Sequence, residues 1–150
     1  MLKLKKMVVM LSFVAAALIF TQSPSLANSD SLYNRLGGYD AVSAVIDDLM
    51  ERLISDKQLG RFWANRGDDG VMREKQLVKS FIASKAGGPL FYLGRENKQS
   101  HRGMKISDED WKIFMGHLEA TLVKFALPPR EKNDVVSFIE STRKDIVNVK

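Results

Sequence analysis

Apolar residues recur every three or four positions along most of the chain after residue 28. This spacing places them on one face of an α-helix. The clearest stripe is Val42, Val45, Ile46, Leu49 and Leu53, with charged residues between them. No stretch alternates apolar and polar residues for long enough to predict a β-strand. The pattern therefore predicts an all-α fold.

Turn-forming residues divide the pattern into helices. The expected helices are one over about 31–36, one that follows Asp40 and carries the stripe 42–53, and one over about 71–85. A further helix starts at Ser107 and carries an apolar stripe to Phe125, and a last helix after Pro128-Pro129 includes 135–146. We expect Asp40 to cap the second helix, and Ser107 with Asp110 to form a capping box at the fourth. In the third helix the residues expected to face inward are Leu77, Val78, Phe81 and Ile82. Residues 90–106 lose the helical period, so this is where functional residues are expected.

The first 27 residues have the pattern of a secretory signal peptide. Lys3, Lys5 and Lys6 precede an apolar run over 7–20, and Ser25-Leu26-Ala27 is typical of a cleavage site. The run is shorter than the roughly 20 residues of a membrane-spanning helix, although an uncleaved anchor is an alternative. We therefore expect a signal peptide at 1–27 and one domain at 28–150, exported to a bacterial periplasm or exterior. Membrane contact is expected only during export.

Charge and cysteine content exclude several classes of protein. Removing residues 1–27 takes away three lysines and no acidic residue, which lowers the formal net charge from +5 to +2. We therefore expect no nucleic-acid partner. The chain has no cysteine, which excludes disulfides, thiolate metal sites and covalent haem in a C-x-x-C-H motif.

Motifs for catalysis are absent, and no catalytic residue is predicted. The chain lacks nucleotide-binding loops, a zinc-protease motif and a nucleophile elbow. The acidic clusters 47–48, 68–69 and 108–110 are better explained by solvation or helix capping. His117 lies off the apolar stripe of its helix and is expected on the surface or flank. The polar neighbours of His101 predict solvent exposure, yet one histidine suffices for haem, because the porphyrin supplies four nitrogens.

Several separate motifs match one family. They are the run 32–42 (LYNRLGGYDAV), Phe62-Trp63, Gly87-Gly88-Pro89, Tyr92 with Gly94 and Arg95, and residues 98–101 with Gly103 and Ile106. In this order they resemble the group 1 truncated haemoglobins over essentially all of residues 28–150. The resemblance implies a truncated globin fold, a two-over-two helical sandwich that binds one haem b per chain. Arg143 stands where one family member attaches haem through a histidine, so non-covalent binding is expected.

The resemblance also implies the cofactor contacts. It places His101 as the proximal ligand, which binds iron through one ring nitrogen while the other nitrogen donates a hydrogen bond. Lys98 matches a residue that reaches a haem propionate, and Arg95 and Tyr92 are further candidates there. The full set of expected haem contacts is Phe62, Trp63, Phe81, Ile82, Tyr92, Arg95, Lys98, His101 and Met104, with His101 the metal ligand. Asn97 departs from the methionine common in the family.

The distal side, which faces the gas, departs from the better-known pattern. Met50 aligns with a tyrosine that donates a hydrogen bond to dioxygen in many members. Glu74 stands at the position that gates the pocket in the family, and Val78 stands where the family often has glutamine. Met50 and Val78 have no polar hydrogen to donate, so weak retention of dioxygen is expected. A shift of one residue would bring Lys75 and Lys79 to these positions instead.

The leading hypothesis is a globin that reversibly binds dioxygen, nitric oxide or carbon monoxide. An alternative is a haem-dependent nitric oxide dioxygenase or peroxidase, which would need an external reductase, because the chain has no flavin or nicotinamide motif. Another alternative is a haem-free helical interaction module. His101 and the apolar residues Phe62, Phe81 and Ile82 argue against that last reading.

Overall fold

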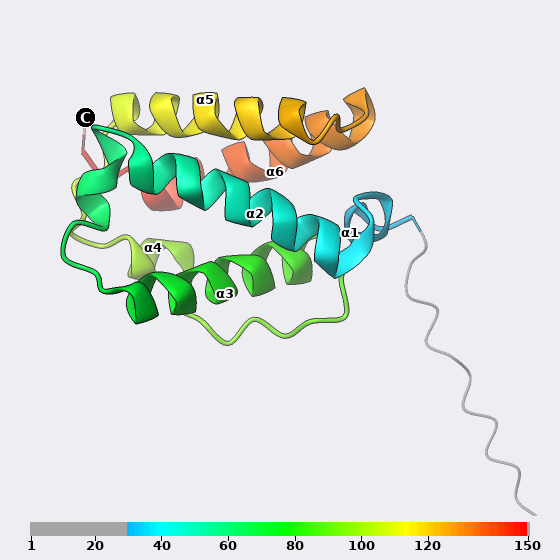
Figure 1. Cartoon of the computed structure of the whole chain (residues 1–150), viewed down its shortest axis with the longest axis horizontal. Helices are drawn as coiled ribbons and strands as arrows, with labels where there is room; N and C mark the ends of the chain where they lie inside the picture. The colour runs from blue at the N-terminus through cyan, green and yellow to red at the C-terminus, as the bar shows by residue number, and fades with distance from the viewer. Residues whose placement is uncertain (1–29, 150) are drawn as a thin grey trace, which may run out of the picture.

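The computed structural model describes residues 30–149, and every regular element within this range is helical. The predicted signal peptide and its cleavage site lie outside the described residues. The elements are α1 (Leu32–Arg35), α2 (Gly38–Ser55), a short 3-10 helix η1 (Leu59–Phe62), α3 (Asp68–Lys85), α4 (Asn97–Ser100), α5 (Asp108–Lys124) and α6 (Pro129–Ile146) (Figure 1). Over residues 30–149 none of these helices has the length and apolar character needed to span a membrane. The all-α prediction is confirmed.

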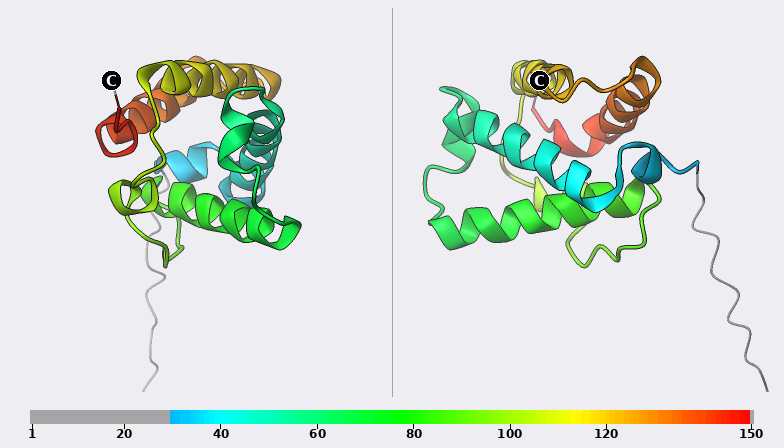
Figure 2. Two further views of the ribbon diagram at one scale, coloured as in Figure 1. Left: turned by 90° about the vertical axis from the view of Figure 1, so that its left-hand side faces the viewer. Right: turned by 45° about the vertical axis from the view of Figure 1, so that its right-hand side comes forward.

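Helix α2 packs against both α3 and α5, and these helices surround a common centre with α6 (Figure 2). The core consists of apolar residues that are at most 5% exposed. They are Val42, Ile46, Leu49, Met50, Leu53, Leu59, Ala83, Leu118 and Leu122. The stripe predicted on α2 therefore faces the core, with Val45 only partly buried.

Two helices begin earlier than the apolar pattern predicts. Helix α2 starts at Gly38, and its N-cap is Gly37 with φ 98°, a left-handed conformation that favours glycine. The prediction that Asp40 caps this helix is wrong, because Asp40 lies inside the first turn. Helix α3 starts at Asp68 rather than near residue 71, and acidic side chains in its first turn favour the positive helix end. The capping box of Ser107 and Asp110 is confirmed.

Helix α1 docks onto the end of α3 at a glycine. The amide of Tyr33 donates to the carbonyl of Ala86 over 2.9 Å. A Cβ on Gly88 would lie 2.6 Å from the Tyr33 ring and 2.8 Å from the Ala83 carbonyl oxygen, so only glycine allows this approach. The contact fixes the start of the loop that leads from α3 to α4.

Asp110 ties η1 to α5 in addition to its capping role. Its side chain is 1% exposed and accepts hydrogen bonds of 2.7 Å from both Arg61 and Gln58. Burial raises the pKa of this carboxyl, but hydrogen bonds from Arg61, Gln58 and Ser107 outweigh burial and hold the pKa well below its usual range. The acidic cluster at 108–110 thus includes one buried structural carboxylate.

Acid is expected to destabilise the fold through two further carboxylates. Hydrogen bonds from Lys124 and Arg52 lower the pKa of Asp48 from 3.8 to about 2. Hydrogen bonds from the Leu59 amide and His117 lower that of Asp56 to about 2. A lowered folded-state pKa gives stability that is complete above the unfolded pKa and lost as the pH falls through the folded one. The free energy of unfolding should therefore decline between about pH 5 and pH 2, measured by urea denaturation.

The Asp48→Asn variant should be less stable at pH 7 and should lose less stability on acidification. Glu51→Gln is a matched control, because Glu51 is an exposed acid on the same helix. Parallel pH profiles for the Asp48→Asn variant and the wild type would contradict this prediction.

Candidate functional site

A cavity of about 580 Å³ lies between α2, α3, α4, α5 and α6. This volume is typical of small-molecule sites, which span roughly 300–1,000 Å³. Of the predicted cofactor and distal residues, those that line it are Met50, Phe62, Trp63, Glu74, Val78, Phe81, Ile82, Tyr92, Arg95, His101 and Met104. Lys98 is exposed on α4 and does not line the cavity. The structure therefore brings together residues spread over 55 positions of sequence, from 50 to 104.

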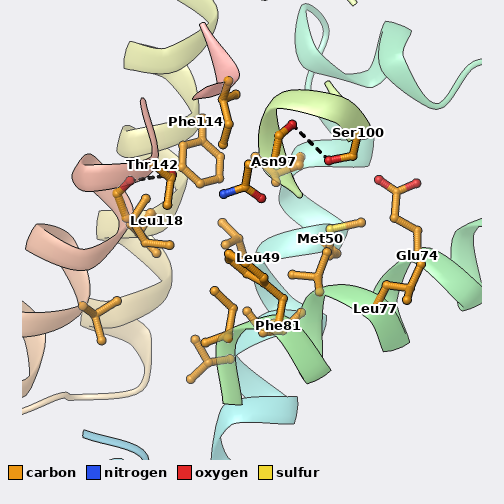
Figure 3. Close-up of a pocket in the computed structure, with 18 of the residues that line it drawn as sticks. Leu49, Met50, Glu74, Leu77, Phe81, Asn97, Ser100, Phe114, Leu118 and Thr142 are labelled. Atoms are coloured by element: carbon orange, nitrogen blue, oxygen red, sulfur yellow. Dashed lines mark hydrogen bonds between the residues drawn. The ribbon is translucent and has the colours of Figure 1, made fainter. Parts of the chain in front are cut away.

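The cavity walls are mainly apolar and come from helices on opposite sides of the cavity (Figure 3). Helices α2 and α3 contribute Leu49, Met50 and Phe81, while α5 contributes Phe114 and Leu118. Leu77 lines the cavity yet is 44% exposed, so it lies at the edge of α3's inward face. This lining suits an apolar molecule bound between these helices.

His101 lies at the C-terminal end of α4, and its side chain is half-buried in the cavity wall. The exposure predicted from its polar neighbours is therefore wrong, because Lys98, Gln99 and Arg102 are exposed whereas the His101 side chain lines the cavity. Its Nδ1 lies 2.8 Å from the backbone carbonyl oxygen of Asn97. A carbonyl only accepts hydrogen bonds, so Nδ1 carries the proton. The Nε2 lone pair of the neutral ring is then available to a metal.

On the other wall, Met50 is 3% exposed and Val78 is half-buried. Lys75 and Lys79, the residues of the alternative register, do not line the cavity. Lys79 Nζ instead lies 2.8 Å from Asp47 Oδ2, which explains how a lysine is 6% exposed. Met50 and Val78 thus present no hydrogen-bond donor to the cavity.

Glu74, on α3, is the acidic group on this side of the cavity (Figure 3). Arg66 belongs to the loop before α3, and its Nη1 lies 2.7 Å from Glu74 Oε2. Sequence reasoning missed Arg66, because nothing in a turn-rich loop indicates that its side chain reaches the following helix. Arg73, within α3, also lines the cavity and was missed, because a charged residue outside the apolar period of a helix gives no sign of facing inward.

Tyr92 and Arg95 belong to the loop between α3 and α4. The Tyr92 ring packs edge-on against Phe81 with 5.1 Å between ring centroids. Its hydroxyl donates to the Arg95 carbonyl over 2.8 Å, and burial raises its pKa above the usual value. These contacts hold the loop against α3 and place Arg95 at the cavity.

His117, the second histidine, has a structural role. It is half-buried on the flank of α5, with Nε2 2.9 Å from Asp56 Oδ2, and it does not line the cavity. Asp56 also accepts from the amides of Gln58 and Leu59 over 2.8 Å each. The pair therefore connects the end of α2 to α5.

The cavity residues fit a haem. The apolar walls suit the porphyrin, and Arg66, Arg73 and Arg95 supply positive charge suited to its propionates. The imidazole of His101 is a group of the kind that could ligate a haem iron. Trp63 Nε1 is buried in the lining without a hydrogen-bond partner among residues 30–149, so a bound group could satisfy it.

Known proteins give the same picture. The family model described as bacterial-like globin matches residues 31–148. A group 1 truncated hemoglobin of Chlamydomonas moewusii is 28% identical over 91% of this chain and 79% of its own. The group 1 truncated hemoglobin GlbN of Mycolicibacterium paratuberculosis is 29% identical over 75% of this chain and 81% of its own.

Solved structures agree with this chain in fold as well as sequence. A mutant truncated hemoglobin from Tetrahymena pyriformis, in its Fe(III) form, has a TM-score of 0.71 and 26% identity over 79% of this chain and 98% of its own. THB1 of Chlamydomonas reinhardtii has a TM-score of 0.66 and 31% identity over 80% and 98%. The chain belongs to the bacterial-like globin family, is a haem-binding globin, and has the two-over-two helical fold of the truncated haemoglobins.

Proposed function

We propose that this globin binds one haem b without a covalent bond, through Nε2 of His101, and reversibly binds a diatomic gas. When bound, haem would supply an iron that the His101 imidazole could ligate and that could bind a small gas. The observation that carries the proposal is the 2.8 Å contact between His101 Nδ1 and the Asn97 carbonyl within an apolar cavity. It fixes the ring tautomer that leaves Nε2 free.

The distal wall supports weak retention of dioxygen. Dioxygen in such a pocket is retained by hydrogen-bond donors, and neither Met50 nor Val78 supplies one. The carboxylate of Glu74 forms an ion pair with Arg66, and an ionised carboxylate can only accept hydrogen bonds. We therefore infer a pocket in which carbon monoxide or nitric oxide is favoured over dioxygen, relative to truncated haemoglobins with a distal tyrosine.

Haem binding is tested by titrating hemin into the protein expressed without residues 1–27. We expect a Soret band that saturates at one hemin per chain, and extraction of all haem by acidified organic solvent. Absence of a Soret band would exclude haem, and a pigment that stays with the polypeptide after extraction would exclude non-covalent binding. Turnover of nitric oxide with an external reductant would distinguish an enzyme from a gas carrier.

Export by residues 1–27 is a separate proposal that rests on the basic, apolar and small-residue pattern of that segment. N-terminal sequencing of the protein recovered outside the bacterial cytoplasm should begin at Asn28. Recovery of a chain that begins at Met1 would contradict cleavage.

A further inference from the structure

Helix α4 carries the proposed haem ligand but has little to hold it in place. It has four residues, and a helix this short is not stable by itself. Its main packing partner among the described helices is α6. The segment after it, residues 102–105, includes Gly103 with φ 78° and Lys105 with φ 54°. A lysine in the left-handed region costs energy and persists only where surrounding contacts hold it.

Asn148, just after α6, contacts both ends of the segment 101–106. Its Nδ2 donates to the backbone carbonyl of His101 over 2.9 Å and to that of Ile146 over 3.3 Å. Its Oδ1 accepts from the amide of Ile106 over 3.1 Å. The backbone amides of Asn148 and Val149 also donate to the Ile106 carbonyl, over 3.0 and 3.2 Å.

These hydrogen bonds affect the orientation of the His101 ring through the backbone. The carbonyl of Asn97 accepts from both the amide and the Nδ1 of His101, over 3.0 and 2.8 Å. The ring direction therefore depends on the position of the 97–101 backbone. Asn148 holds this backbone at the His101 carbonyl and at the amide of Ile106, which follows the left-handed Lys105. A side chain with one donor group and one acceptor is suited to do both.

We propose that Asn148 is a positioning residue for His101, which holds α4 and the imidazole in the ligating orientation before the cofactor arrives. The proposal rests on the proposed role of His101 as the haem ligand. It assigns a function in haem capture to the segment after α6, which lines no part of the haem cavity itself.

The Asn148→Asp variant separates the two halves of the contact. The aspartate keeps an oxygen for the Ile106 amide but loses both amide donors and faces the His101 carbonyl with a negative charge. Asn148→Ser is a second, milder variant, in case the aspartate variant does not fold. Asn133→Asp is the matched control, because Asn133 is exposed on α6.

The first readout uses haem-free protein. Nitrogen-15 NMR of the His101 ring should show the Nδ1-protonated tautomer in the wild type and in Asn133→Asp, and a mixture of tautomers in Asn148→Asp. Amide hydrogen exchange at residues 100–102 should be faster in that variant. The second readout is hemin loss to an excess of apomyoglobin, which should be about tenfold faster, the effect expected when a hydrogen bond to one carbonyl is lost.

A variant with a lower melting temperature but with the wild-type ring tautomer and the wild-type rate of hemin loss would show that Asn148 only stabilises the C-terminal segment. That result would overturn the proposal. If no variant takes up hemin, the proposed haem function fails, while the ring tautomer and exchange data still decide whether Asn148 orients His101.

Discussion

Replacing His101 with glycine is expected to abolish the spectrum of a histidine-ligated haem and to increase the rate of hemin loss. Residues that merely orient a metal ligand typically contribute about 10- to 100-fold to metal affinity, and loss of the ligand itself should exceed this. His101 is the histidine that lines the cavity, and its Nδ1 is held by the Asn97 carbonyl. Absorption and resonance Raman spectra of the hemin-loaded variant measure the effect.

Two controls make the result specific. Imidazole added to the His101→Gly variant should occupy the space left by the ring and restore the histidine-type spectrum. His117→Gly should keep the wild-type spectrum, because His117 is bound to Asp56 away from the cavity. An unchanged spectrum in His101→Gly would mean that another residue ligates the iron.

Changing Met50 to tyrosine is expected to slow dioxygen dissociation by about 10- to 100-fold. The new hydroxyl would add a hydrogen bond to the bound gas where the wild-type wall has only a thioether. A hydrogen bond with charge on one partner contributes about 1.5–3 kcal/mol, and each 1.4 kcal/mol is a factor of ten. Met50 is 3% exposed and lines the cavity, so the hydroxyl would be shielded from water.

Stopped-flow dissociation from the ferrous protein measures the rate. Met50→Phe is the matched control, because it adds the same aromatic ring without the hydroxyl, and any effect of overpacking appears in both variants. Slower release from the tyrosine variant than from the phenylalanine variant isolates the hydrogen bond. Equal release from the two would show that residue 50 does not donate to the gas.

The helices were predictable because their signals are local. A period of three to four apolar residues indicates a buried face, and Ser107 with Asp110 indicates a helix start. The start of α3 was less predictable, because residues 68–70 are polar and carry no apolar period. Helix starts are set there by backbone hydrogen bonds and by the helix dipole, which a hydrophobic pattern does not report.

The site was predictable in part, and mainly through the family resemblance. Residue chemistry alone favoured an exposed His101, whereas the structure half-buries it in the cavity wall. The ion pair of Arg66 with Glu74 and the contact of Asn148 with His101 join residues 8 and 47 positions apart. Such pairs leave no periodic signal, because they depend on how the helices pack.

An all-helical fold, the apolar face of each main helix and the absence of thiolate chemistry could be read from residue type and local spacing. The packing of α3 determines that Glu74 and Val78 line the cavity while Lys75 and Lys79 turn towards Asp47. The fold also places Nδ1 of His101 against the Asn97 carbonyl and the side-chain amide of Asn148 against the His101 carbonyl. The rotation of a helix about its own axis is set by the surfaces it packs against. Because neighbouring residues point in different directions, a rotation by one residue would change which side chains face the cavity.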